Sequence, residues 1–186
     1  GWYLQPDCNM ISGESFIRQI AAGRHYFSEK FGVKPWVAVN VDSFGHSRGM
    51  VQILAKCGYR GYIVRRPGED EFHRGVLDFW WNGLDGSRIR VVRIPSYSTT
   101  MGIAARQIEE AAQKTENSSI IKFWGVGNHG GGPSRKDLEE IQSLQKNSKN
   151  INYKHSFPEE YSENLSEEAP NIEESLHPSM PACYIS

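Results

Sequence analysis

Long apolar runs, paired cysteines and an excess of either charge are missing from this sequence. No stretch reaches the roughly 20 consecutive apolar residues that a bilayer-crossing helix needs. The formal net charge of −1 gives no reason to expect nucleic acid or an anionic membrane as a partner. The three cysteines, Cys8, Cys57 and Cys183, lack the spacing of a metal site or a disulfide framework. We therefore expect no nucleic acid and no membrane as partners. The cysteines indicate either a reducing compartment or buried thiols, and we expect the cytoplasm.

The length and composition fit part of a globular protein. With 38% hydrophobic and 23% charged residues, the 186 residues suffice for one domain with a core. The chain opens on Gly1-Trp2-Tyr3-Leu4, which is typical of a strand inside a fold, and no initiator Met precedes it. We expect residues 1–186 to be one partial domain.

Apolar periodicity predicts helices and strands that alternate along the chain. Helical spacing marks residues 14–31, 47–57, 100–115 and a stretch after Ser134. Short apolar or β-branched runs mark strands at 37–41, 61–65, 77–81, 89–94 and 120–126. This alternation predicts an α/β fold with a largely parallel sheet, in a barrel or a doubly wound layer. In both architectures the active site lies at the carboxyl ends of the strands.

Local signals predict where several elements begin and end. Ser12 is a candidate N-cap of the first helix, and Gly32 lies just past its end. Ser134, with Asp137 three residues later, is the candidate N-cap of the last helix. The glycines of 82–87 predict a hairpin loop. The inner face of the last helix is expected to carry three apolar residues, Leu138, Ile141 and Leu144.

Asp42 directly follows the strand expected at 37–41 and opens the tight segment Asp42-Ser43-Phe44-Gly45-His46. A carboxylate at a strand end can bind a metal ion, attack an anomeric carbon or cap the next helix. Spacing alone leaves these alternatives open and favours the cap. A histidine four residues past a strand end is more often packed and hydrogen-bonded than a ligand, and we interpret His46 in that way.

A glycine run follows the strand expected at 120–126. Gly130, Gly131 and Gly132, after Asn128 and His129, permit close approach of the backbone to a ligand. The Lys-Ser/Thr of a phosphate-binding loop is missing, which argues against a nucleotide site. If the two strands run parallel, Asn128 and His129 lie on the same rim as Asp42.

Two further segments carry candidate sugar-binding residues. Asp7 and Asn9 can hydrogen-bond sugar hydroxyls, although Pro, Asp and Asn also suit a turn without function. Trp80-Trp81 can offer a stacking platform, but a strand alternates its faces, so only one of them can face a given site. We assign Trp81 to that role, while paired aromatics of this kind are more often core.

Taken together, the motifs resemble the N-terminal catalytic domain of glycoside hydrolase family 38, the retaining α-mannosidases of the bacterial and cytosolic type. The order and spacing match over residues 1–165, and 166–186 match poorly, as an irregular tail. The segments that carry the resemblance are 1–10, 12–19, Asn40-Val41-Asp42-Ser43-Phe44-Gly45-His46-Ser47, 52–59, 79–95 and Gly125-Val126-Gly127-Asn128-His129-Gly130-Gly131-Gly132-Pro133-Ser134.

This resemblance implies an irregular seven-stranded β/α barrel, incomplete in this chain, and one zinc ion. It implies hydrolysis of terminal α-mannosyl residues of mannose-containing oligosaccharides. Asp42 would be both the nucleophile that forms a glycosyl-enzyme intermediate and a zinc ligand. The general two-carboxylate logic of retaining glycosidases agrees with that assignment.

Three positions depart from the family pattern. The upstream His-x-Asp zinc pair has no counterpart, because the chain begins after the point where it would lie. A further zinc-ligating histidine is matched by His177, displaced by a residue or two. The acid/base position falls at Asn128, whose neutral amide cannot donate a proton. His129 or a residue outside this chain would then take that role.

Alternative functions follow from these departures. A non-catalytic carbohydrate-binding or interaction remnant would explain the missing ligands. A zinc-dependent carbohydrate deacetylase can use a similar barrel, but it would need a His-x-x-x-His pair, which the sequence lacks. An incomplete barrel exposes strand edges, which favour association into a homo-oligomer. We expect the isolated chain to bind zinc weakly and to hydrolyse little.

Overall fold

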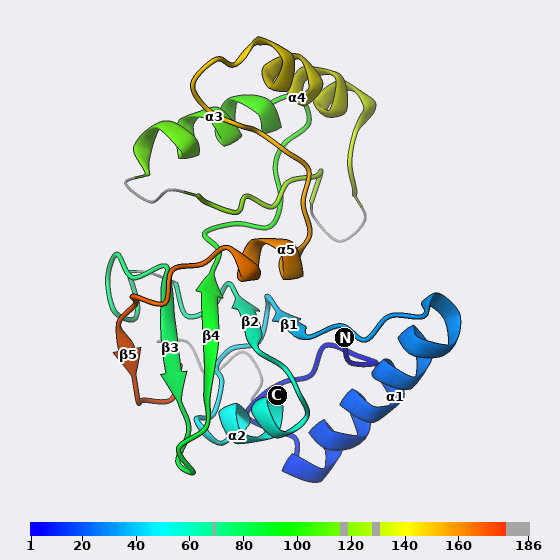
Figure 1. Cartoon of the computed structure of the whole chain (residues 1–186), viewed down its shortest axis with the longest axis vertical. Helices are drawn as coiled ribbons and strands as arrows, with labels where there is room; N and C mark the ends of the chain where they lie inside the picture. The colour runs from blue at the N-terminus through cyan, green and yellow to red at the C-terminus, as the bar shows by residue number, and fades with distance from the viewer. Residues whose placement is uncertain (69, 116–118, 128–130, 178–186) are drawn as a thin grey trace. The chain divides into compact units, whose positions relative to one another are not determined.

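The computed structural model describes residues 1–68, 70–115, 119–127 and 131–177, and the chain divides into two compact units (Figure 1). The larger unit comprises Gly1–Pro95 and the segment from Pro158 onward. The smaller unit comprises Ser96–Phe157. The expectation of one partial domain over residues 1–186 stays a prediction.

A five-stranded sheet forms the centre of the larger unit. Its strands are β1 (Val37–Asn40), β2 (Gly61–Val64), β3 (Asp78–Asn82), β4 (Arg88–Arg93) and β5 (Asn171–Ile172), in the order β1-β2-β4-β3-β5. The pairs β1–β2, β2–β4 and β3–β5 are parallel, and β3–β4 is an antiparallel hairpin. The predicted α/β class with a mostly parallel sheet is confirmed. The seven-stranded barrel stays a prediction.

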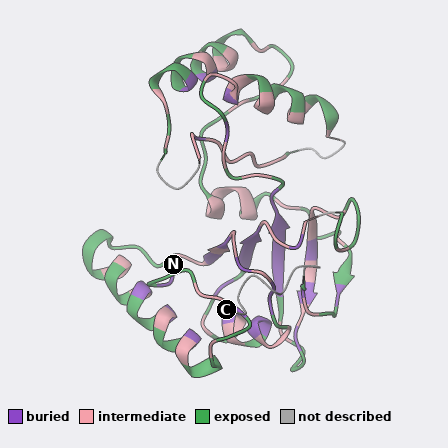
Figure 2. Ribbon diagram, turned by 180° about the vertical axis from the view of Figure 1, so that it is seen from behind, coloured by how far each residue is buried: buried purple, intermediate pink, exposed green. Residues whose placement is uncertain are grey.

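The sheet is buried at its centre, as Figure 2 shows by the concentration of buried residues in its strands. All four residues of β2 are buried, and Ile89 and Val91 of β4 have no exposed surface. Strands covered on both faces read as apolar runs, as β2 does, whereas in β4 the apolar residues stand between arginines. This core holds the strand ends in fixed positions.

Two helices complete the core on this sheet. Helix α1 (Gly13–Phe31) packs against α2 (Gly49–Lys56), and α2 packs against β4 (Figure 1). The Ser12 hydroxyl accepts a hydrogen bond from the Ser15 N–H at 3.2 Å, and Gly32 ends α1 with a φ of 67°. Both predicted caps of α1 are therefore confirmed.

Sequence patterns gave one strand too many at the N-terminus. Residues 1–4 form no strand, and the Tyr3 N–H donates to the Gln19 carbonyl of α1 at 3.0 Å. The buried ring of Trp2 packs among Phe16, Tyr59 and Tyr62. The apolar residues of this segment therefore serve the core without pairing in the sheet.

The smaller unit contains two helices, α3 (Ala104–Lys114) and α4 (Arg135–Asn147), which pack against each other. The Ser134 hydroxyl accepts from the Asp137 N–H, which confirms the predicted cap. The buried Asp137 carboxylate accepts from the N–H groups of Gly102 and Ala104 and so joins the two helices. The hydrogen bond from Ser134 is the leading cause that holds the pKa of Asp137 below its usual value.

Two expectations for the smaller unit are wrong. Residues 120–126 form no strand, and only an isolated bridge joins Val126 to Thr99. An apolar run becomes a strand only where a neighbouring strand pairs with it, and none is present beside the described residues of this run. On α4, Ile141 is buried, but Leu138 is 42% exposed, so the expected inner face is only partly formed.

The C-terminal segment contains two elements that the sequence analysis missed. Helix α5 (Pro158–Glu163) begins with Pro and two acidic residues, a pattern that favours a helix start. Strand β5 is only two residues long and pairs with Trp80 and Trp81 of β3. None of the helices in the described ranges combines the length and apolar character that crossing a bilayer requires.

Candidate active site

Asp42 lies two residues beyond the carboxyl end of β1, at the start of the loop 42–46. Helix α2 begins at Gly49, and its N-cap position is Arg48, which makes no side-chain capping hydrogen bond. Asp42 is therefore not the cap of this helix, and the interpretation favoured by spacing alone is wrong. Its half-buried side chain is held in the loop that follows β1, an edge strand that pairs in parallel with β2.

Ser43 closes this loop and attaches it to the segment of Asp7 and Asn9. The buried Ser43 hydroxyl donates to the Gly45 carbonyl at 2.9 Å and accepts from the Cys8 N–H at 3.2 Å. These two bonds fix the part of the loop that directly follows Asp42. They also bring the N-terminal turn, distant in sequence, beside the end of β1.

Gly45 is the point where Asn9 and His177 meet the loop. Its φ is 141°, which side-chain-bearing residues rarely adopt. A Cβ added here would lie 2.5 Å from Asn9 Nδ2 and 3.0 Å from His177 Nδ1. Glycine is required both by its backbone angle and by these two neighbours.

One carboxylate oxygen of Asp7 stabilises a local turn, and the other is left without a hydrogen bond to any described residue. Its Oδ1 accepts from the Asn9 N–H at 2.9 Å, which is the turn that the sequence pattern indicated. Its Oδ2 is buried and makes no hydrogen bond to any described residue. A buried acceptor without a donor is costly, so this oxygen is suited to bind a donor such as a hydroxyl.

His46 is a packed, hydrogen-bonded side chain, as expected. It is fully buried, its Nε2 lies 3.0 Å from the Arg66 carbonyl oxygen, and its Nδ1 lies 2.7 Å from the Tyr62 hydroxyl. Burial lowers the pKa of His46 to about 4, so the ring is neutral at physiological pH.

His177 is exposed. It lies beside this loop because its neighbour Leu176 is hydrogen-bonded to the His46 backbone. The His46 N–H donates to the Leu176 carbonyl at 2.7 Å, and the Leu176 N–H donates to the His46 carbonyl at 2.9 Å. The structure thus brings His177 into the same loop cluster as Asp42. Within the described ranges, however, no three His, Cys, Asp or Glu residues gather as a metal site would require. Because zinc takes at least three protein ligands, the described donor set is incomplete.

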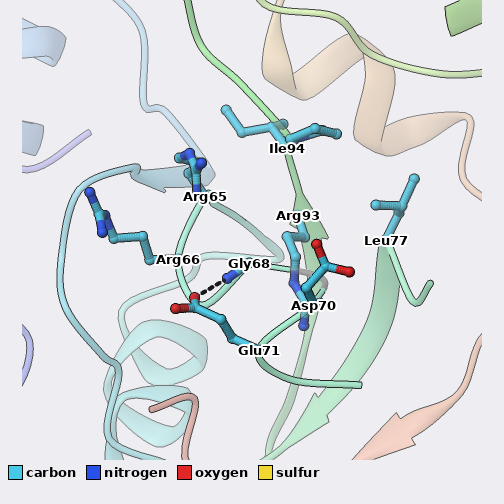
Figure 3. A pocket seen from close by; sticks show the side chains of 9 residues that line it. Arg65, Arg66, Gly68, Asp70, Glu71, Leu77, Arg93 and Ile94 are labelled. Atoms are coloured by element: carbon cyan, nitrogen blue, oxygen red, sulfur yellow. Dashed lines mark hydrogen bonds between the residues drawn. The ribbon is translucent and has the colours of Figure 1, made fainter. Parts of the chain in front are cut away.

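A cavity of about 340 Å³ opens at the carboxyl ends of β2 and β4 (Figure 3). It has both donors and acceptors along its walls. The Glu71 carboxylate accepts from the Gly68 N–H at 2.8 Å, the hydrogen bond that is dashed in Figure 3. The Arg66 guanidinium lies 4.3 Å from the centre of the Phe44 ring, which links this wall to the loop of Asp42. The lining residues are Arg65, Arg66, Gly68, Asp70, Glu71, Leu77, Arg93, Ile94 and Pro95.

Trp81 lies among core side chains. It has no exposed surface, stacks on Tyr62 with ring centres 6.3 Å apart, and donates its indole N–H to the Glu174 carbonyl. Its neighbour Trp80 points to the other face, where Arg88 lies 4.2 Å from its ring. The buried position of Trp81 matches the alternative that it is a core residue. Its contact with a sugar stays a prediction, which requires that the ring become exposed.

Asn128 and His129, the candidate acid/base positions, lie outside the described residues. The Val126 N–H, which precedes them, donates to the carbonyl of Gly132, which follows them, at 2.9 Å. Gly125 has a φ of 134°. The expectation that they share a rim with Asp42 depended on a strand at 120–126, which is not formed.

Sequence reasoning missed the residues that support this site. Tyr62 lies in the middle of an otherwise apolar strand, and a polar group in such a run usually has a buried partner. Cys8 lies in a segment singled out for Asp7 and Asn9, yet it is the buried member of that segment. The positions of Tyr62 and Cys8 were the signals from which the sequence could have indicated these buried supporting residues.

A largely parallel sheet with a carboxylate loop and a polar cavity at the carboxyl ends of its strands is typical of α/β enzyme domains. Solved structures share the fold. An α-mannosidase from Enterococcus faecalis V583 aligns over 94% of this chain and 21% of its own, with a TM-score of 0.69 and 20% identity. A 4-α-glucanotransferase from Thermococcus litoralis aligns over 94% of this chain and 29% of its own, with a TM-score of 0.62 and 14% identity.

The model of the glycosyl hydrolases family 38 N-terminal domain matches residues 1–182. The chain belongs to this family. Human α-mannosidase 2C1 is 31% identical over 152 residues, which cover 77% of this chain and 14% of that protein. An α-mannosidase of Saccharomyces cerevisiae is 27% identical over 150 residues, again 14% of its length. The chain thus spans about a seventh of these relatives.

The packing around Gly45 yields a prediction on stability. Gly45→Ala combines a positive φ with a Cβ that meets Asn9 and His177, whereas Gly86→Ala has a positive φ of 81° and no described atom within 4 Å of the added Cβ. We expect Gly86→Ala to lower the free energy of unfolding by about 1 kcal/mol, and Gly45→Ala to lower it by a further 1–3 kcal/mol or so. Denaturant titration measures both, and equal losses would contradict the packing described here.

Proposed function

We propose that the complete gene product that carries this chain is a retaining α-mannosidase acting on terminal α-mannosyl residues of oligosaccharides. The carrying observation is the loop of Asp42, held at the end of β1 by Ser43, Gly45 and His46, in a chain matched by the family model over residues 1–182. The two sequence relatives named above, the human and the yeast α-mannosidase, support the same substrate class.

In the proposed mechanism Asp42 attacks the anomeric carbon of the bound mannose. The bond to the leaving oxygen breaks as the Asp42 carboxylate forms a glycosyl ester, and water then hydrolyses that ester with net retention. A second group must protonate the leaving oxygen and later deprotonate the water. The neutral amide of Asn128 cannot do so, and we assign that role to His129 or to a residue outside this chain.

The N-terminal turn supplies the proposed contacts to the sugar. The buried Oδ2 of Asp7 can accept a hydrogen bond from a mannose hydroxyl, and the Asn9 amide can donate one. Both groups are tied to the Asp42 loop through the Cys8 N–H and the Ser43 hydroxyl. Their separation from Asp42 is therefore held by a bond between a backbone N–H and a buried side-chain hydroxyl.

Zinc is proposed as the cofactor, with Asp42 and His177 as two of its ligands. A bound zinc ion would supply positive charge that fixes mannose hydroxyls and favours distortion of the ring. The described residues provide no third ligand in this cluster, so the remaining donors must come from outside the described ranges. The two residues lie on segments joined by the His46–Leu176 bridge.

The complete domain is proposed to close the sheet into the seven-stranded β/α barrel. In the described sheet, β1 and β5 are the edge strands, and further strands could pair with them. The same edges would favour association of copies of this chain into a homo-oligomer. We retain the cytoplasm as the proposed compartment, since Cys8 and Cys57 are free thiols.

A non-catalytic, mannose-binding remnant is the second candidate. The incomplete donor set among the described residues favours it. A carbohydrate deacetylase has less support, because the sequence contains no His-x-x-x-His pair. Binding of mannose that persists after removal of metal, without any turnover, would favour the remnant over the hydrolase.

Replacing the nucleophile tests the proposed function. In the complete gene product, we expect Asp42→Asn to lower hydrolysis of an aryl α-mannoside by at least about a thousandfold, because an amide cannot form the glycosyl ester. A fluorinated, activated mannoside that slows the second step should label the peptide containing Asp42, as mass spectrometry would detect.

The matched control is Asp85→Asn, in the exposed turn between β3 and β4, which should leave the rate unchanged. Undiminished turnover by Asp42→Asn, or a label on a different carboxylate, would remove Asp42 from the mechanism.

Zinc binding gives an independent measurement. We expect His177→Ala to weaken zinc binding by at least about tenfold, since loss of a supporting residue alone commonly costs that much. The control is His25→Ala, whose side chain on α1 is 81% exposed. A titration against a competing chelator reports the affinity without reference to activity. Equal affinities of the two variants would exclude His177 as a ligand.

A further inference from the structure

A chain of buried hydrogen bonds runs beneath the candidate active site. The Asn40 amide donates to Cys8 Sγ at 2.9 Å, Cys8 Sγ lies 3.7 Å from the Tyr62 hydroxyl, and that hydroxyl lies 2.7 Å from His46 Nδ1. His46 Nε2 completes the chain at the Arg66 carbonyl. All four side chains before that carbonyl are buried.

The direction of this chain follows from its last member. A carbonyl oxygen can only accept, so His46 Nε2 must carry the proton. Nδ1 of the neutral ring then has a lone pair, and the Tyr62 O–H must donate to it. Burial raises the pKa of the Cys8 thiol to about 11, so the thiol keeps its proton. Its S–H can donate to the Pro6 carbonyl or to the Tyr62 oxygen, each 3.7 Å from Sγ. The donor and acceptor roles of His46 and Tyr62 are therefore fixed.

His46 connects the buried hydrogen-bond chain to the two segments that carry the candidate zinc ligands, Asp42 and His177. Its ring is held by Tyr62 of β2 and by the carbonyl of Arg66, and its backbone holds Leu176 by two hydrogen bonds. Asp42 begins the loop that ends at His46, and His177 follows Leu176 directly. Loss of the two hydrogen bonds of the ring would release the His46 backbone and so loosen both segments together.

We propose that His46 is a positioning residue of the candidate active site, which holds the Asp42 loop and His177 in register without touching the substrate. The proposal rests on the proposed function for its catalytic consequence. Its structural content, that the ring of His46 maintains the His46–Leu176 bridge, is independent of any activity.

Removal of one hydroxyl gives a sharp test. In the complete gene product, Tyr62→Phe removes the donor to His46 Nδ1 and leaves the ring acceptor unsatisfied in a buried site, whereas Tyr59→Phe removes a buried hydroxyl that lies beside Arg24 and away from His46. Hydrogen–deuterium exchange of peptides spanning 42–48 and 172–177 reports on the bridge. We expect about tenfold faster exchange in both peptides for Tyr62→Phe and no change for Tyr59→Phe.

Kinetics separate positioning from stability alone. We expect Tyr62→Phe to lower kcat about tenfold with KM within about twofold, because the reacting group is displaced while the sugar contacts remain. His46→Gln should retain more activity than His46→Ala, since the glutamine amide can still donate to the Arg66 carbonyl. Tyr59→Phe should keep wild-type kcat.

Each result tests either the positioning role of His46 or the proposed function. Unchanged exchange in Tyr62→Phe, or a nitrogen NMR spectrum of the unmodified protein with the proton of His46 on Nδ1, would overturn the proposal. Equal kcat in Tyr62→Phe and Tyr59→Phe would overturn it as well. If the unmodified protein shows no mannosidase activity while Tyr62→Phe loosens both peptides, the proposed function fails and the bridge-holding role of His46 stands.

Discussion

The pair of backbone hydrogen bonds between His46 and Leu176 is the constraint on which the candidate site depends. It joins a loop near the start of the chain to a segment near its end, and the buried ring of His46 fixes that junction to β2. Because His177 follows Leu176 directly, the junction sets its place beside Gly45. A core packed on both sides of β2 keeps the junction rigid, so the exposed groups are positioned by interior contacts.

Much of the fold follows from local signals in the sequence. Ser12 and Gly32 act within a few residues of their own helix ends, and a capping pattern can therefore be recognised without tertiary contacts. The strand expected at 120–126 failed for the opposite reason, since strand formation depends on a partner that the run itself does not encode. The two-residue strand β5 was missed because it owes its conformation entirely to pairing with β3.

The sequence singled out candidate residues for the site but did not reveal which of them lie close together. Asp42 stood out as a carboxylate at a strand end, and the family resemblance supplied its expected role. The proximity of His177 arises from a bridge between distant segments, which no local pattern reveals. Trp81 shows the complementary limit: an aromatic residue in a strand suits a sugar platform or a core equally well, and only the burial of its ring distinguishes them.

The central claim is that the carboxylate of Asp42 faces the reacting carbon of a mannose. A crystal structure of the complete gene product with zinc and a slowly reacting mannoside tests it most directly. The account predicts an Asp42 oxygen about 3–3.5 Å from the anomeric carbon, and both Asp42 and His177 at about 2.0–2.2 Å from the metal. An Asp42 side chain turned away from the sugar, with another carboxylate at that carbon, would contradict it.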